Sequence, residues 1–306
     1  MTVLLTGAAG FIGKYVAFKL AESGVPIIGL DSLEPRVHRT PPVIPLGVEF
    51  HVGHVGICPL DLIERSDVVI HLAAQVGVAD SMTDPLRYVV QNTMETAQFL
   101  ALLEKAATVK RIVVASSMSV YGEGGLDVRE SEPCVPQSVY GQTKYDQERL
   151  VRMWGEQHKV PAVALRFFNV YGPGQALHNP YTGVLANFAN RLLHDESPII
   201  YEDGLQIRDW IYADDVADAV CIAAMEDTPA RTYNISTGRQ TTLLDAARML
   251  TEAMGKHLTP IVTGTKRPGD VRHCSGDPKL AYYKLRWAAK TPLEEGLKAY
   301  ADSLPK

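Results

Sequence analysis

Residues 3–13 read VLLTGAAGFIG and place three glycines directly after a short apolar run. The run is rich in β-forming residues, and a pattern with helical spacing begins at Phe11. Glycine permits a positive φ and a close approach of the backbone, so Gly7, Gly10 and Gly13 predict a tight turn between a strand and a helix. The helix N-terminus would direct its free N–H groups at a pyrophosphate. This stretch therefore predicts a dinucleotide-binding loop.

An acidic residue ends the next predicted strand. The run IIGL leads directly into Asp31. A carboxylate there can bind both hydroxyls of an adenosine ribose and would repel a 2′-phosphate. We therefore expect NAD as the cofactor. NADP stays the alternative, because Arg36, His38 and Arg39 follow closely and could serve a 2′-phosphate.

Short apolar runs alternate with helical patterns over the first half of the chain. The runs VLLTG, PIIGLD, VVIHLAA, RIVVASS and AVALRFFN are typical of buried strands. Helical spacing lies between them, at residues 11–23, 85–107 and 138–158. This alternation predicts a Rossmann-type α/β domain over residues 1–168, with a doubly wound parallel sheet. The proline-rich segment 34–59 is expected to be irregular, with one short strand at VEFHV.

The pattern changes after residue 168. The stretch VYGPGQALHNPYTG is typical of a loop, and the strand and helix patterns beyond it follow no strict order. We expect residues 169–306 to form a smaller C-terminal mixed α/β lobe that binds the substrate, with some chain returning to the first domain. A cleft between the two parts would be the ligand site.

Composition excludes several functional classes. The 306 residues are 46% hydrophobic and 21% charged, as is typical of a globular protein. The net charge of −5 argues against a general nucleic-acid binder. No apolar run reaches the roughly 18 residues that span a bilayer, and the N-terminus has no signal-peptide pattern. We expect a cytoplasmic protein without nucleic-acid or membrane partners. Its four cysteines form no C-x-x-C pair, which favours buried thiols over a zinc site.

A second cluster of motifs indicates chemistry. The predicted strand RIVVASS continues into MSVYG, and YGQTK at 140–144 lies on a predicted helix. Tyr140 and Lys144 are four residues apart and therefore share a helix face. An ammonium beside a phenol favours the phenolate, so we expect a lowered Tyr140 pKa and a general base for a sugar hydroxyl. A serine at the strand end could hydrogen-bond the same oxygen.

Together these motifs resemble the extended short-chain dehydrogenase/reductase superfamily, in its branch of NAD-dependent nucleotide-sugar epimerases and dehydratases. The resemblance continues through HLAAQ, LRFFNVYGPGQ, EDGLQIRDWIYADDVA, YNISTG and KRPGDVRHCSGDP, and so covers nearly the whole chain. A finer resemblance, through LDSLEPRVH, ASSMSVYGEG and NPYTGVLANF, is to dTDP-L-rhamnose 4-epimerase-like proteins.

The resemblance implies a role for each matching residue. Tyr140 would be the general base, Lys144 would also hold the nicotinamide ribose, and Ser117 would contact the sugar O4. The expected catalytic set is therefore Ser117, Tyr140 and Lys144. The expected cofactor-binding set is Gly7, Gly10, Phe11, Ile12, Gly13, Asp31, Ser32, His54, Leu72, Ala73, Ala74, Asn92, Tyr140 and Lys144. The expected substrate-binding set is Ser117, Met118, Ser119, Asn169, Tyr201, Arg208, Arg267 and Asp270. No metal is implied.

Within the substrate set, the resemblance distinguishes the parts of a sugar nucleotide. Asn169 would contact the diphosphate, and Arg208 and Arg267 would neutralise it. Asp270 would lie near the nucleotide ribose, and Tyr201 near the base.

Two positions depart from the family pattern. His54 stands where the family has an aspartate that meets the adenine amine, although a neutral imidazole could still accept that hydrogen bond. Met118 and Ser119 stand where sugar dehydratases carry an acid. Neither can protonate or deprotonate carbon at neutral pH, which argues against dehydration.

The resemblance implies 4-epimerisation of a dTDP- or UDP-sugar, by reversible hydride transfer between sugar C4 and tightly bound NAD. An NAD(P)H-dependent 4-keto-sugar nucleotide reductase would use the same residues and is the first alternative. The second is a non-enzymatic dinucleotide-sensing protein, although such proteins usually lose the tyrosine or the lysine. The resemblance also implies a homodimer, in which helices 85–107 and 138–158 pack into a four-helix bundle.

Overall fold

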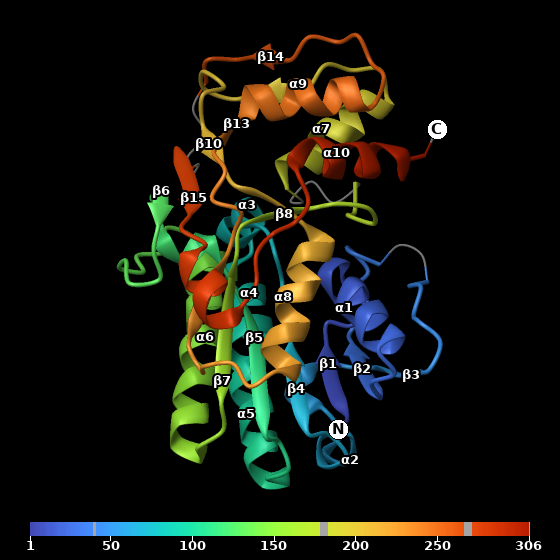
Figure 1. Cartoon of the computed structure of the whole chain (residues 1–306), viewed down its shortest axis with the longest axis vertical. Helices are drawn as coiled ribbons and strands as arrows, with labels where there is room; N and C mark the ends of the chain where they lie inside the picture. The colour runs from blue at the N-terminus through green and yellow to red at the C-terminus, as the bar shows by residue number, and fades with distance from the viewer. Residues whose placement is uncertain (39–40, 178–182, 266–270, 306) are drawn as a thin grey trace.

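Seven strands, each parallel to its neighbours, form the central sheet of the chain in the order β12–β7–β5–β4–β1–β2–β3 (Figure 1). The structure is a computed structural model that describes residues 1–38, 41–177, 183–265 and 271–305. The strands are β1 (Val3–Thr6), β2 (Ile27–Asp31), β3 (Val48–Val52), β4 (Val68–His71), β5 (Arg111–Ser117), β7 (Ala162–Phe167) and β12 (Thr232–Ile235). The predicted doubly wound α/β fold is confirmed.

Helices cover both faces of this sheet. One face carries α1 (Phe11–Glu22) and α8 (Ala213–Met225), and the other carries α2 (Leu60–Glu64), α5 (Glu95–Ala106) and α6 (Val139–His158). Successive side chains of a strand point to opposite faces. In β1, Val3 and Leu5 therefore join the core under α1 and α8, whereas Leu4 joins the core under α5 and α6. Burial on both faces explains why the predicted strands are continuous apolar runs.

The helix predicted at 85–107 contains a wider turn. It consists of α4 (Pro85–Tyr88), a π-helical turn η2 (Val89–Met94) and α5. Tyr88, Asn92 and Thr96 are all fully buried. The π-helical turn therefore lets one side of the helix stay in contact with the protein interior over its first half.

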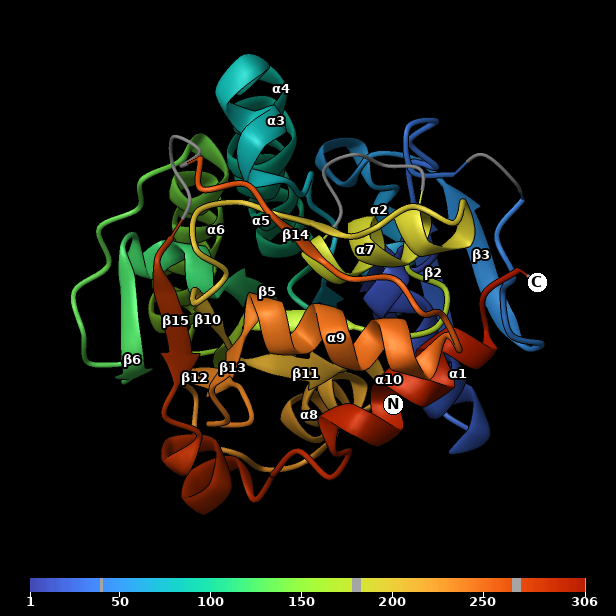
Figure 2. The same cartoon turned by 90° about the horizontal axis from the view of Figure 1, so that it is seen from above.

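The later part of the chain builds a second layer above the sheet. A separate core is formed by side chains from β8 (Asn169–Tyr171), α7 (Val184–Leu193), β11 (Trp210–Tyr212), α9 (Leu243–Ala253) and α10 (Leu293–Asp302). Beside it lies a sheet of β13 (Thr241–Thr242), β10 (Ile207–Arg208), β15 (His273–Gly276) and β6 (Gly124–Val128) (Figure 2). The chain returns to the first sheet at α8 and β12. The domain boundary at residue 168 stays a prediction.

The remaining elements are short. They are η1 (Val55–Ile57), α3 (Val78–Thr83), η3 (Met118–Tyr121), β9 (Ile199–Ile200), β14 (Ile261–Val262) and η4 (Ala281–Leu285). VEFHV, predicted as a short strand, is β3 at the edge of the main sheet. Of the helices in the described part of the chain, none combines the length and the apolar character needed to cross a bilayer.

Candidate active site

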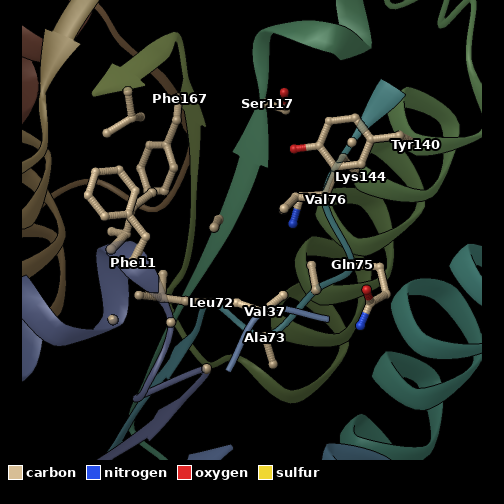
Figure 3. Close-up of a pocket in the computed structure, with 18 of the residues that line it drawn as sticks. Phe11, Val37, Leu72, Ala73, Gln75, Val76, Ser117, Tyr140, Lys144 and Phe167 are labelled. Carbon is tan, nitrogen blue, oxygen red and sulfur yellow. The ribbon is translucent and has the colours of Figure 1, made fainter. Parts of the chain in front are cut away.

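A cavity of about 440 Å³ opens where several parallel strands end. Gly7 follows β1, Asp31 ends β2, Leu72 follows β4, and Ser117 ends β5, and all four line the cavity. The carboxyl ends of the strands are the usual ligand site of such sheets. Figure 3 shows Phe11 and Phe167 on one side of this space and Tyr140 on the other.

The glycine loop lies against the backbone that follows β4. Gly7 has a φ of +70°, and a Cβ there would lie 2.8 Å from the Ala73 nitrogen. A Cβ at Gly13 would overlap the Gly7 carbonyl oxygen. No side chain caps the N-terminus of α1, and the first residues of that helix line the cavity. Free N–H groups beside a cradle without side chains fit the pyrophosphate of a dinucleotide.

Asp31 is held in place by the loop that it faces. Its carboxylate accepts hydrogen bonds from the Ala9 N–H (3.0 Å) and the Leu33 N–H (2.9 Å). It is buried, yet it lines the cavity together with Ser32. Arg36 is turned toward the Asp80 carboxylate at 3.8 Å, and Arg39 lies outside the described residues. His38 lines the cavity, with its Nε2 3.6 Å from an Asp31 oxygen. This surrounding fits the ribose hydroxyls of NAD better than a 2′-phosphate.

His54 faces both the cavity and Glu95. Its Nδ1 lies 3.1 Å from a Glu95 carboxylate oxygen, and both residues line the cavity. A carboxylate accepts but does not donate, so Nδ1 carries the proton in this hydrogen bond. Nε2 of a neutral ring is then an acceptor, as an adenine amine requires. Glu95 was not predicted from the sequence.

The three predicted catalytic residues lie together at the end of β5. The N-terminus of α6 is capped by Ser138, whose hydroxyl accepts from the Gly141 N–H at 3.0 Å. A Cβ at Gly141 would lie 2.6 Å from the Ser119 carbonyl oxygen, so this glycine lets the first turn of α6 approach the end of β5. Tyr140 consequently points its hydroxyl into the cavity beside Ser117, with Lys144 one turn further along (Figure 3).

The two neighbouring serines at the end of β5 have different surroundings. Ser117 lines the cavity, and its hydroxyl accepts from the Ser119 N–H at 3.2 Å. Ser116 donates instead to the buried carboxylate of Glu148 at 2.8 Å. Both serines line the cavity, but the Ser116 hydroxyl is bonded to Glu148, whereas the Ser117 hydroxyl lies beside that of Tyr140.

The expected lowering of the Tyr140 pKa by Lys144 is wrong for the protein alone. Burial raises the Tyr140 pKa, and only its interaction with Ser117 opposes this. Burial also lowers the pKa of Lys144 to about 7. The Lys144 Nζ donates to the Gln147 side chain at 2.6 Å. Spacing on a helix could not reveal this competing partner or the cost of desolvation.

The remaining predicted cofactor residues divide into two groups. Phe11, Ile12, Leu72, Ala73 and Ala74 line the cavity. Asn92 is fully buried and is absent from the lining. Its side chain accepts from the Gln75 N–H (2.7 Å) and donates to the Gln75 carbonyl (3.0 Å). Asn92 therefore holds the backbone just beyond the Leu72–Ala74 run.

The predicted substrate residues are also divided. Met118, Ser119 and Asn169 line the cavity. Arg208 and Tyr201 are outside its lining, and Arg208 donates to three backbone carbonyls, those of Ile207, Val271 and Arg272. Arg267 and Asp270 lie outside the described residues.

Sequence reasoning missed several residues of the cavity wall. Those with polar or aromatic side chains include Glu34, Gln75, Glu95, Phe168, Gln175 and Trp210. The Trp210 indole nitrogen and the Gln175 side-chain oxygen are buried without a partner among the described residues. Gln75 directly follows the small residues after β4, so position alone could have suggested it. Trp210 reaches the cavity only because β11 pairs with β8.

One cavity joins a dinucleotide loop to a serine–tyrosine–lysine cluster, which defines an enzyme of the short-chain dehydrogenase/reductase class. The model of the NAD dependent epimerase/dehydratase family matches residues 3–236. The chain belongs to this family, which confirms the resemblance seen in the sequence.

Named relatives agree with that assignment. The chain is 34% identical to a dTDP-L-rhamnose 4-epimerase of Burkholderia thailandensis, over 96% of this chain and 92% of that one. It is 33% identical to a UDP-glucose 4-epimerase of Thermotoga maritima solved with UDP-glucose, with a TM-score of 0.90 over 99% and 98% of the two chains. It is 29% identical to a Bacillus cereus UDP-glucuronic acid 4-epimerase in complex with UDP-glucuronic acid and NAD, with a TM-score of 0.88 over 99% and 98%.

Proposed function

We propose that the protein is a nucleoside-diphosphate-sugar 4-epimerase that acts by reversible hydride transfer between sugar C4 and tightly bound NAD. The observation that carries this proposal is the single cavity lined by Gly7, Asp31, Ser117, Tyr140 and Lys144. Tyr140, which lines this cavity together with the glycine loop, is the proposed general base. The relatives above, which are named as 4-epimerases, support the same reaction.

The residues of the chain have distinct tasks in this reaction. Tyr140 takes the proton from the sugar O4, and Ser117 hydrogen-bonds that oxygen and orients it. The glycine loop, Asp31 and the Leu72–Ala74 run would hold NAD, which when bound supplies the hydride acceptor and donor. Lys144, one turn after Tyr140, would hold the nicotinamide ribose, as the resemblance implies.

The same family includes dehydratases, and the cavity favours epimerisation over that reaction. Met118 and Ser119 both line the cavity directly after Ser117. Elimination of water needs an acid or base at a sugar carbon, and neither a thioether nor a hydroxyl supplies one at neutral pH. On the resemblance alone, Arg208, Arg267, Asp270 and Tyr201 are proposed to bind the nucleotide part of a dTDP- or UDP-sugar.

We expect the purified protein to interconvert the C4 epimers of a dTDP- or UDP-hexose without added NADH or NADPH. An epimerase regenerates its cofactor in every cycle, so deuterium placed at C4 should stay on C4, as NMR or mass spectrometry of the product would show. If no saturated sugar nucleotide reacts, and a 4-keto sugar instead oxidises NAD(P)H stoichiometrically, the protein is a reductase. No reaction in either assay, with NAD still bound, would indicate a dinucleotide sensor.

A cytoplasmic homodimer is proposed with this function. The helix of residues 85–106 lies beside α6 (Figure 1), and Thr93 donates to Asp146 across their contact at 2.9 Å. Both helices expose apolar side chains, with Leu86 72%, Val89 45% and Met153 55% exposed. Two such helix pairs could pack as a four-helix bundle. The four free cysteines fit a reducing compartment.

Val89→Glu should convert the dimer into a monomer, because a carboxylate would be buried without a partner at the proposed interface. Sedimentation velocity measures the change. Ile57→Glu is the matched control, since Ile57 is 76% exposed but lies outside both helices. A wild-type protein that sediments as a monomer at micromolar concentration would contradict the bundle.

A further inference from the structure

A chain of buried hydrogen bonds leads away from Lys144 behind the cavity. Lys144 donates to the Gln147 Oε1 at 2.6 Å. The Gln147 Nε2 lies 2.9 Å from the Thr96 hydroxyl, 3.2 Å from the His71 Nε2 and 3.3 Å from the Ala73 carbonyl. Lys144, Gln147, His71 and Thr96 are at most 3% exposed. Gln147 thus connects the lysine on α6 with the backbone after β4 that lines the cavity.

The donors and acceptors of this network favour one neutral form of His71. An ammonium only donates, so the Gln147 oxygen faces Lys144 and its amide nitrogen faces His71. The His71 Nε2 also lies 3.0 Å from the Thr96 hydroxyl, so its contact with Gln147 is a hydrogen bond only in the tautomer that carries the proton on Nδ1. The Nδ1–H donates to the Thr6 hydroxyl at 2.8 Å, and that hydroxyl also accepts from the Ala73 N–H at 3.3 Å. His71 is therefore neutral, and Ala73 is held through both its N–H and its carbonyl.

We propose that Gln147 is a positioning residue that holds the Lys144 ammonium and the cofactor-lining backbone at Ala73 in a fixed relation, through a neutral His71. The proposal rests on the proposed function, in which Lys144 holds the nicotinamide ribose and the Leu72–Ala74 run lies along the cofactor. An amide suits this position because its oxygen accepts from the ammonium while its N–H groups donate to a carbonyl and an imidazole. A carboxylate could accept from the ammonium but could not donate to the other two groups.

The charges around Lys144 make its protonation sensitive to this amide. The titratable groups that interact with it are Glu148 from its own helix and His71 from β4, and Glu148 is already paired with Arg166 of β7 at 2.7 Å. Burial lowers the pKa of Lys144 to about 7 and that of His71 to about 3. The Gln147 oxygen is the acceptor nearest to the ammonium among the contacts described for it.

Two substitutions of Gln147 should move the pH profile of kcat in opposite directions. Gln147→Met keeps the side-chain volume but removes the hydrogen-bond acceptor, so Lys144 should lose its proton at a lower pH. The fall of kcat on the alkaline side of its pH profile should therefore move down by about one to two pH units. Gln147→Glu adds a negative charge beside the Lys144 ammonium, so the fall of kcat on the alkaline side should move to higher pH. A merely structural defect would lower the rate in both variants without opposite shifts. Gln157, exposed on the same helix, provides the control substitutions to Met and Glu.

A second measurement does not depend on activity. In protein labelled with ¹⁵N-histidine, wild-type His71 should show the neutral Nδ1–H form by NMR. In Gln147→Glu the carboxylate faces the His71 Nε2 and should attract a proton there, which gives the Nε2–H form or the imidazolium. The proposal would be overturned by an unchanged His71 signal in Gln147→Glu. It would also be overturned if the alkaline fall of kcat came at the same pH in Gln147→Met and Gln147→Glu. If no sugar nucleotide reacts, the epimerase reading fails, and the NMR measurement still decides the role of Gln147.

Discussion

Tyr140→Phe should lower the turnover number by about 10²–10⁴-fold, the usual worth of a general base. The substitution removes the phenolic hydroxyl that points into the cavity beside Ser117 and leaves the ring in its place (Figure 3). Affinity for the sugar nucleotide should stay nearly unchanged, because the lost group acts on the reacting proton. Steady-state kinetics and isothermal titration with the same substrate separate the two effects.

Tyr145→Phe is the matched control for this loss. It removes a phenolic hydroxyl from the same helix, at a residue that packs in the core behind η3 and is absent from the cavity lining. Its turnover should remain close to that of the wild type. Near-normal turnover in Tyr140→Phe would remove Tyr140 from the mechanism.

Arg166→Met should lower the free energy of unfolding by about 3–5 kcal/mol, because it leaves a buried carboxylate without its counter-ion. The Arg166 and Glu148 side chains are 4% and 3% exposed, and two guanidinium nitrogens donate to the carboxylate at 2.7 and 3.0 Å. The same carboxylate accepts from Ser116 and Thr232. The pair therefore joins α6 to three strands of the sheet. Denaturant unfolding at a fixed NAD concentration measures the loss.

A double variant tests whether the uncompensated charge causes this loss. Arg166→Met with Glu148→Leu removes both charges, so it should be more stable than Arg166→Met alone. Arg65→Met breaks an exposed ion pair with Glu49 and should change stability much less. Equal losses for the buried and the exposed arginine would contradict this account of the pair.

The fold could be predicted because its signals are local. Buried parallel strands are apolar on both faces, and the VLLTGAAGFIG stretch contains the strand, the turn glycines and the helix start within eleven residues. Ser117, Tyr140 and Lys144 could be predicted as a cluster for a similar reason, since each follows or faces the end of one strand. Position along a strand or helix determined where these side chains lie.

Properties that depend on packing between distant segments could not be predicted. Trp210 lines the cavity through the pairing of β11 with β8, which no local pattern records. The Tyr140 pKa is raised because this side chain is buried, and the Lys144 ammonium, expected to lower it, donates to Gln147 instead. Asn92 was expected beside the cofactor, but its amide is used to hold Gln75.

The π-helical turn at Val89–Met94 is equivalent to the insertion of one residue into a regular α-helix. Tyr88 and Thr96, both fully buried, are eight residues apart and would be about 80° out of phase in a regular α-helix. With one residue deleted they would be seven apart and only about 20° out of phase, so a regular helix would bury both. The deletion would displace Asn92, which holds the backbone next to the cavity. A lineage could therefore lose this residue and keep the fold, but the loop beside the cofactor would lose its anchor.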